Sequence, residues 1–163
     1  MHSRIYQISE KPIDKDDYVT EDNYYESFCG SHADYVDGNT DRNEDIEWVI
    51  GCLGDSVSYD EKEQSFTIIN KTKYFEKSFV AFNELLEKLE NTTLEEFSGV
   101  ASVDTQRTFE SNMYMLKTAY EDEYAFYIDD RGEYFGITPL DYFMRRVETG
   151  KKFYIGATID YHF

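Results

Sequence analysis

Cysteine, proline and basic residues are scarce in this chain of 163 residues, and long apolar runs are absent. Two cysteines without a second pair build neither a disulfide framework nor a zinc site. No window approaches the roughly 20 apolar residues that span a bilayer, and no apolar run follows Met1 as a signal peptide requires. We therefore expect a cytoplasmic protein with free thiols. Because no glycine-rich phosphate loop or metal-ligand spacing of histidines occurs, we expect no cofactor and no metal.

The charge of the chain is strongly one-sided, with 34 acidic and 16 basic residues and a formal net charge of −18. Direct binding to a nucleic acid or an anionic membrane would meet electrostatic repulsion. Residues 1–63 hold 17 acids and 5 bases, a net charge of −12, whereas residues 64–163 hold 17 and 11, a net charge of −6. The acidity is therefore concentrated in the front of the chain.

The periodicity of the apolar residues predicts one α+β domain over residues 1–163. We expect a mainly antiparallel sheet of about five or six strands with three or four helices. The expected strands are 4–8, 56–59, 65–69, 123–129, 134–137 and 153–159, and the two terminal strands are expected to lie in the same sheet. The expected helices are 41–53, 71–90, 101–120 and 138–150, with Asp41 and Thr138 as N-caps.

Two features of these elements are specific enough to check. The sequence Asp130-Arg131-Gly132 predicts a tight hairpin turn between the strands 123–129 and 134–137. In the helix 71–90, apolar residues recur at spacings of three and four, which predicts one buried stripe. This stripe consists of Phe75, Phe79, Phe82, Leu86 and Leu89.

The most informative feature is a long acidic loop at residues 10–40 that leads into the first helix. Thirteen carboxylates and only three bases lie between Glu10 and Glu47, interleaved with aromatic residues. A disordered acidic tail would lack these aromatics, so we expect them to fold or dock the segment and hold its charges in place. The residues predicted to bind a partner are Asp14, Asp16, Asp17, Glu21, Asp22, Tyr24, Tyr25, Glu26, Phe28, Asp34, Asp37 and Asp41.

Two other patterns resemble known sites but depart from them. Residues 37–45 are similar to the front of a calcium loop, but Arg42 stands at the glycine position and Trp48 at the bidentate glutamate position. Gly54-Asp55-Ser56 resembles the nucleophile block of the SGNH hydrolases, with Asp160 and His162 as the other members of a triad. That family separates its acid and histidine by two residues, and here only one intervenes.

Both ends of the chain carry a further resemblance. The opening Met1-His2-Ser3-Arg4-Ile5-Tyr6-Gln7-Ile8-Ser9 with Lys11-Pro12-Ile13, and the ending Tyr154-Ile155-Gly156 with Ile159-Asp160-Tyr161-His162-Phe163, resemble small acidic proteins of Firmicutes mobile genetic elements. In composition the chain is similar to the anti-CRISPR and anti-restriction proteins that such elements carry. The resemblance implies a function in evading host defence, and it assigns no roles to single residues.

These observations favour a non-enzymatic inhibitor that mimics DNA and occupies the nucleic-acid-binding surface of a host defence nuclease. A CRISPR effector is the leading candidate partner, because such effectors hold nucleic acid in a basic channel. Two alternatives stay open. One is an immunity or antitoxin protein that caps a basic toxin, and the other is a small SGNH-like hydrolase that uses Ser56 and His162.

Overall fold

The computed structural model describes residues 2–100, 102–121 and 126–163, which form seven strands and five α-helices. The chain divides into two compact units: residues 1–74 with 124–163, here called the sheet unit, and residues 75–123, here called the helical unit. The predicted α+β class is confirmed. The sheet has seven strands, one more than the upper prediction, because a short strand also forms inside the acidic segment.

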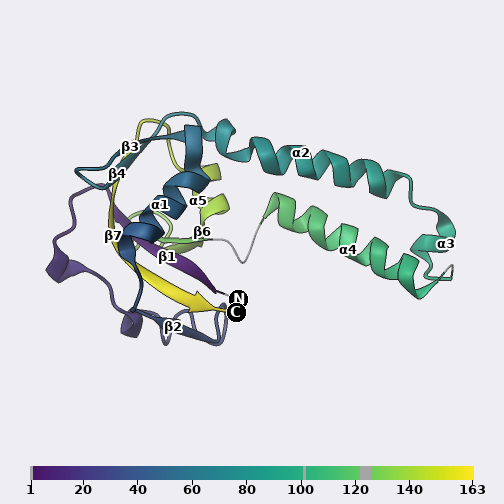
Figure 1. The fold of residues 1–163 in the computed structure, drawn as a ribbon, viewed down its shortest axis with the longest axis horizontal. Coiled ribbons are helices and arrows are strands. Elements are labelled where there is room, and N and C mark those ends of the chain that lie inside the picture. The colour runs from purple at the N-terminus through teal and green to yellow at the C-terminus, as the bar shows by residue number, and fades with distance from the viewer. Residues whose placement is uncertain (1, 101, 122–125) are drawn as a thin grey trace. The chain divides into compact units, whose positions relative to one another are not determined.

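The sheet is mixed and mostly antiparallel, with strand order β3-β4-β7-β1-β5-β6. Figure 1 shows β1 and β7 side by side. The central strands are β1 (His2–Ser9) and β7 (Lys152–His162), which lie in the same sheet as predicted and pair antiparallel with each other. β3 (Val57–Asp60) and β4 (Ser65–Ile68) form the expected hairpin, and β4 pairs with the start of β7. β2 (Tyr35–Asp37) pairs with the end of β7, whereas β5 (Tyr127–Asp129) runs parallel to β1.

The two faces of the sheet are covered by different parts of the chain. Successive side chains of a strand point to opposite faces, so Tyr6 and Ile5 of β1 point in opposite directions. α1 (Arg42–Leu53) lies on the Tyr6 face, where the Tyr6 hydroxyl donates to the Asp45 carbonyl oxygen at 2.8 Å. The acidic segment packs on the Ile5 face, within one hydrophobic cluster. As predicted, the side chain of Asp41 caps α1, accepting from the N–H groups of Asn43 and Glu44.

The connection between β5 and β6 (Ile137–Pro139) differs from the predicted tight turn. Asp129 pairs with Ile137, so residues 130–136 form a seven-residue loop. The buried Asp130 carboxylate organises this loop by accepting four backbone N–H bonds at 2.7 to 3.1 Å, from Gly132, Tyr134, Phe135 and Gly136. A local pattern of turn residues does not reveal such a carboxylate-centred loop. Part of the predicted strand 123–129 lies outside the described residues.

The predicted helix 138–150 is shorter in the structure, where α5 spans Leu140–Arg146. The expected N-cap, Thr138, instead pairs with Ile128 as part of β6, and no side chain caps the helix. The N–H of Leu140 donates to the carbonyl oxygen of Phe126 at 2.8 Å, which continues the strand contact into the first turn. Pairing with the sheet therefore overrides the local capping signal.

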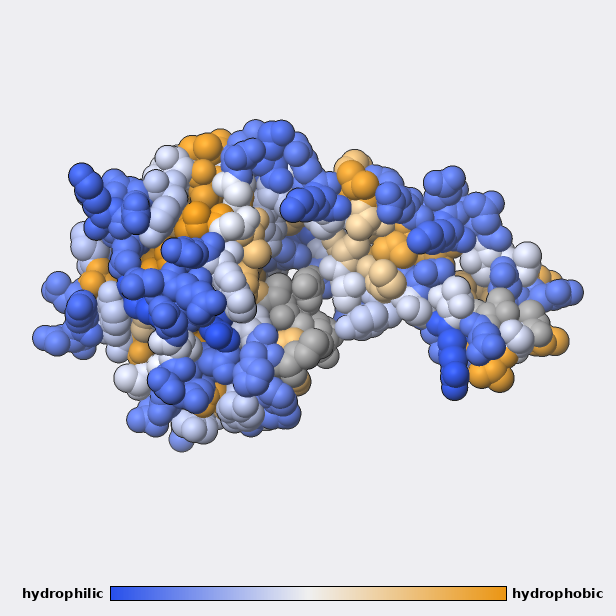
Figure 2. Space-filling model, in the orientation of Figure 1, coloured by the Kyte–Doolittle hydropathy of each residue, from blue (hydrophilic) through white to orange (hydrophobic). Residues whose placement is uncertain are grey.

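The helical unit contains most of α2 (Lys71–Glu90), the short α3 (Leu94–Phe97) and α4 (Val103–Tyr120). The predicted buried stripe of α2 is wrong in two places, because Phe79 is 64% exposed and Leu86 is 37% exposed. Among the described residues of this unit, only Leu85 is fully buried. Part of the apolar stripe of α2 is therefore uncovered, and apolar side chains lie among hydrophilic ones over this unit (Figure 2).

Candidate interaction surface

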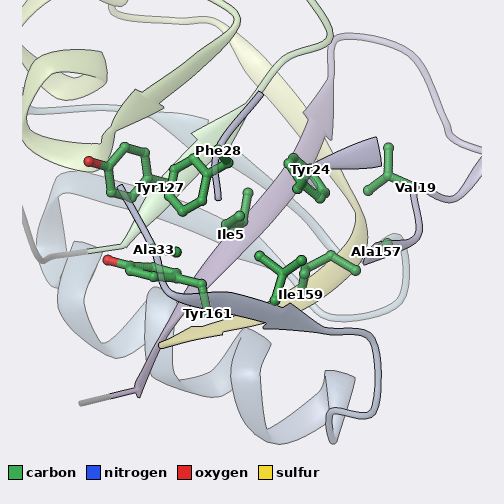
Figure 3. Packing of buried hydrophobic residues seen from close by; sticks show 10 residues of the cluster. Ile5, Val19, Tyr24, Phe28, Ala33, Tyr127, Ala157, Ile159 and Tyr161 are labelled. Carbon is green, nitrogen blue, oxygen red and sulfur yellow. The ribbon is translucent and has the colours of Figure 1, made fainter. Parts of the chain in front are cut away.

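The acidic segment, residues 10–41, is packed onto the sheet by apolar side chains. Val19, Tyr24, Phe28, Ala33 and Val36 are all buried in the cluster that covers the Ile5 face of the sheet. Figure 3 shows Phe28 beside Tyr127 and Tyr161, and the ring centroids lie 4.8 and 5.2 Å apart with their planes nearly perpendicular. Edge-to-face rings of this kind stabilise a fixed arrangement. The backbone that carries the carboxylates is therefore attached to the core.

A buried glutamine ties the segment to the two central strands. The Gln7 side-chain oxygen accepts from the N–H groups of Val19 and Ala157, each at 3.1 Å. Its side-chain nitrogen donates to the carbonyl oxygen of Asp17 at 3.0 Å. Gln7 is only 4% exposed, so these bonds replace water around otherwise unsatisfied polar groups. One side chain thus sets the position of residues 17–19 relative to β1 and β7.

The rest of the segment is held by a second set of polar contacts. The Tyr24 hydroxyl donates to the buried carboxylate of Asp129 at 2.7 Å, and burial together with this carboxylate raises the pKa of Tyr24. Farther along, β2 pairs with β7, and the hydroxyls of Thr40 and Thr158 lie 2.7 Å apart. Contacts at residues 17–19, 24 and 35–40 therefore fix the segment at several points along its length.

The structure exposes most of the carboxylates that the sequence predicts as partner-binding. Glu21 is half-buried, and its carboxylate accepts from the N–H of Gly38 at 2.7 Å. This bond joins two parts of the acidic segment that are 17 residues apart. The exposed members are Asp14, Asp16, Asp17, Asp22, Glu26, Asp34, Asp37 and Asp41. Two of these have local roles as well, since Asp37 accepts from the N–H of Asn39 and Asp41 caps α1.

Seven of the eight exposed carboxylates, all except Asp34, form no ion pair within the part of the chain that the structure describes. Five of these seven also have no local capping role: Asp14, Asp16, Asp17, Asp22 and Glu26. The arginine of this region is used elsewhere. The Arg42 guanidinium donates to the carbonyl oxygens of Ile155 and Gly156, each at 2.6 Å, and also to the side-chain oxygen of Gln64. Because Arg42 binds backbone and amide oxygens, it leaves the carboxylates of the segment unneutralised.

The three predicted aromatic anchors have different positions. Tyr25 is 51% exposed and is available to a partner. Tyr24 and Phe28 are almost completely buried, so in this structure they attach the segment to the core and offer no surface. Aromatic residues in a sequence do not distinguish attachment to the chain's own sheet from attachment to a partner, because both bury the same rings. The candidate surface consequently rests on its charges.

A buried ionic network on the opposite face was not found from the sequence. Arg4 donates to the Asp45 carboxylate at 2.7 Å and also pairs with Asp160. The hydroxyl of Thr158 donates to the other oxygen of Asp45 at 2.8 Å. Asp45 is 2% exposed, so it belongs to the core although it is one of the thirteen acids counted in the sequence. The one available signal was Arg4 itself, a cation inside an apolar terminal strand.

The geometry opposes the hydrolase hypothesis. Ser56 is fully buried, and its hydroxyl donates to the carbonyl oxygen of Leu53. It precedes β3 at the end of the sheet where β7 begins, whereas His162 lies at the end of β7 and stacks on Tyr35. The ten residue steps of β7 separate these two ends by roughly 33 Å at the rise of an extended strand. Ser56 and His162 are therefore not brought together.

In the described ranges, no group of three or more histidine, cysteine, aspartate or glutamate side chains is placed to hold a metal ion. Residues 37–45, which resemble the front of a calcium loop, end β2 and begin α1. Asp37 and Asp41 accept backbone N–H groups there, and Asp45 pairs with Arg4. None of the helices that the structure describes combines the length and apolar character needed to span a bilayer.

No protein-family model matches the chain, and neither a curated protein nor a solved structure shows significant similarity to it.

Proposed function

We propose that this chain is a non-enzymatic inhibitor that acts in the cytoplasm and binds the nucleic-acid-binding surface of a host defence nuclease. The observation that carries the proposal is the set of exposed, unpaired carboxylates at Asp14, Asp16, Asp17 and Asp22 on a backbone attached to the core. Fixed charges complement a basic channel better than the charges of a mobile tail, because less conformational entropy is lost on binding. Carboxylates also accept the bidentate contacts that arginine makes with phosphates.

A CRISPR effector is the partner class that we favour. Such effectors read a short duplex motif with arginines and hold nucleic acid in a positively charged channel, and an acidic protein surface competes for both. The net charge of −18 is consistent with this choice, because it disfavours nucleic acid itself as the ligand. An immunity protein that caps a basic toxin would use the same surface, so the experiment must identify the target by its activity.

The test is a competition assay with purified CRISPR effectors loaded with guide RNA and a fluorescent target duplex. We expect the protein to prevent duplex binding to at least one effector, with an affinity that falls steeply as ionic strength rises, because exposed charges are screened beyond about 10 Å at 0.1 M salt. If no effector in the panel loses DNA binding or cleavage, the proposed function is wrong. Protection of cells from a basic toxin would then favour the immunity function.

Matched charge variants separate a local surface from net charge. The front variant changes Asp14, Asp16, Asp17 and Asp22 to asparagine; Glu21 is left intact because it braces Gly38. The control variant changes four other exposed acids, Asp55, Glu61, Glu121 and Glu148, to their amides. We expect the front variant to bind about tenfold more weakly or worse, since each exposed pair contributes about 0.2–1 kcal/mol. Equal losses from both variants would show that only net charge matters.

A further inference from the structure

The helical unit contains an apolar pocket that its own side chains leave open. Leu89, at the end of α2, faces Leu94 and Phe97 of α3 and Phe109 and Met113 of α4 across a pocket of about 480 Å³. Its remaining lining is two threonines, so no charged group lines it. Pockets of about 300–1,000 Å³ are the usual size of ligand sites. The pocket therefore has room for apolar side chains of a ligand.

The apolar surface extends beyond the pocket onto the turn between α3 and α4. Leu94 is 81% exposed, Phe97 69% and Val100 79%. Soluble monomers rarely expose contiguous large apolar side chains without a binding role. α3 presents these residues in a defined position, because Thr93 and Glu96 form a capping box in which each side chain accepts the other's N–H. The edge of Phe97 also contacts the Phe109 ring at 5.7 Å between centroids.

The charges beside this pocket indicate what covers it. Between the lining residues Leu89 and Phe97 the chain contains three glutamates and no base; Glu90 and Glu95 are exposed and Glu96 is half-buried. A second copy of the chain would bring the same glutamates together, and an anionic lipid surface would be repelled. A small molecule would find few polar groups to orient it, because Thr93 is already used in the capping box. The ligand that fits is apolar and flanked by positive charge.

We infer that the pocket binds a basic amphipathic helix of the target protein, seated with its apolar face on Phe97, Leu94 and Met113. Grooves between helices accept such faces through anchors at i, i+3, i+4 and i+7, and methionine adapts to anchors of different shape. The inference rests on the proposed function, since a nucleic-acid-binding enzyme is a natural source of basic helices. It assigns the helical unit a second contact, independent of the carboxylates of the acidic segment.

The probe is a synthetic 14-residue peptide labelled with fluorescein. Its leucines are spaced three and four residues apart, so that they lie on one face of a helix and the lysines lie on the other. We expect saturable one-to-one binding by anisotropy and an increase in helical circular dichroism of the peptide on binding. A peptide of the same composition in scrambled order, and an amphipathic peptide with glutamate in place of lysine, serve as controls. Equal binding of the scrambled peptide would overturn the inference, because charge alone would then account for it.

Variants of the full chain locate the binding. Phe97→Ala should weaken peptide binding about tenfold, as truncation of a central aromatic anchor does. Phe79→Ala is the matched control, since Phe79 is 64% exposed but does not line the pocket, and it should change the affinity less than twofold. Leu94→Ala is a second pocket variant, at an 81% exposed position that the fold does not require buried. Unchanged binding by both pocket variants would overturn the inference.

Two further outcomes separate this inference from the proposed function. If sedimentation shows a dimer that Phe97→Ala dissociates, a second copy covers the pocket and the inference is wrong. The front variant should bind the peptide within twofold of the parent, because it leaves residues 84–113 unchanged. Peptide binding without inhibition of any effector would contradict only the proposed function. Effector inhibition that both pocket variants leave intact would contradict only this inference.

Discussion

Replacing Gln7 with methionine tests whether one buried amide fixes the acidic segment. The two side chains have similar length, so the change removes hydrogen bonds without opening a large cavity. The N–H groups of Val19 and Ala157 lose their acceptor, and both residues are only 7% exposed, so water does not replace it. The carbonyl oxygen of Asp17 loses a donor too, but Asp17 is exposed and its carbonyl can be hydrated.

The expected loss of stability follows from these contacts. A buried N–H left without an acceptor costs about 1–3 kcal/mol, so two of them cost about 2–5 kcal/mol once incomplete burial is allowed for. The free energy of unfolding of a domain is about 5–15 kcal/mol, and a change of this size lowers the melting temperature by about 5–15 °C in a chain of this length. Gln7→Met should therefore leave a folded but clearly weakened protein.

The assay is urea unfolding followed by fluorescence of Trp48, the one tryptophan of the chain, which lies on α1 in the sheet unit. Amide hydrogen exchange should show in addition that Val19 and its neighbours lose protection more than β4 does. Gln106→Met is the matched control, because Gln106 is an exposed residue of α4 whose side-chain amide donates to Glu110. A loss below about 1 kcal/mol, equal to that of the control, would refute the role assigned to Gln7.

Three other predictions concern the core of the sheet unit. Gly156→Ala should lower the free energy of unfolding by about 1–3 kcal/mol, because a Cβ would lie 2.5 Å from the Gln7 side-chain oxygen and 2.9 Å from Ile13 Cδ1. Gly51→Ala, in open space within α1, should raise it slightly. Urea unfolding compares the two variants. Deleting the last ten residues removes most of β7 and should abolish cooperative unfolding, so a truncated protein that melts like the parent would contradict the central role of this strand. Burial and the Asp129 carboxylate raise the pKa of Tyr24 above its value of about 10 in the unfolded chain. Above pH 10 the folded state therefore keeps a proton that the unfolded state loses. The free energy of unfolding should fall there by up to about 1.4 kcal/mol per pH unit. Tyr24→Phe should reduce that alkaline slope in unfolding measured between pH 9 and 11, and an unchanged slope would show that Tyr24 titrates normally.

Most strands and the long helices could be predicted because their signals are local, whereas β2 lies in a segment predicted as a loop. A short run of β-prone residues bounded by polar residues and a proline places β1, and capping by Asp41 places α1, within a residue or two of the observed bounds. The loop after β5 could not be predicted, because its conformation depends on the Asp130 carboxylate reaching N–H groups as far as six residues away. The bounds of α5 were predicted wrongly for a related reason: Thr138 pairs with Ile128 in the sheet, so it does not cap the helix.

The candidate surface was predictable in charge but not in geometry. Acidic clustering between Glu10 and Glu47 is visible in the printed sequence, yet the burial of Asp45 beside Arg4 depends on which face of α1 meets the sheet. The same holds for Gln7, whose partners at Val19 and Ala157 are 12 and 150 residues away. A polar residue inside an apolar strand indicates that something polar will meet it, without indicating what.

The burial of Tyr24 and Phe28 changes how the proposed inhibitor would recognise its target. Aromatic side chains at the centre of an interface usually provide most of the affinity. In the acidic segment, two of the three predicted rings are buried in the core and cannot contact a partner. Charges alone provide attraction and fast association, but little affinity once salt screens them. A surface of this kind needs an apolar contact to slow dissociation, and Phe97 and Leu94 of the helical unit are exposed apolar residues that could make one. The two proposals therefore predict different kinetic signatures: the front variant should mainly lower the association rate, and Phe97→Ala should mainly raise the dissociation rate.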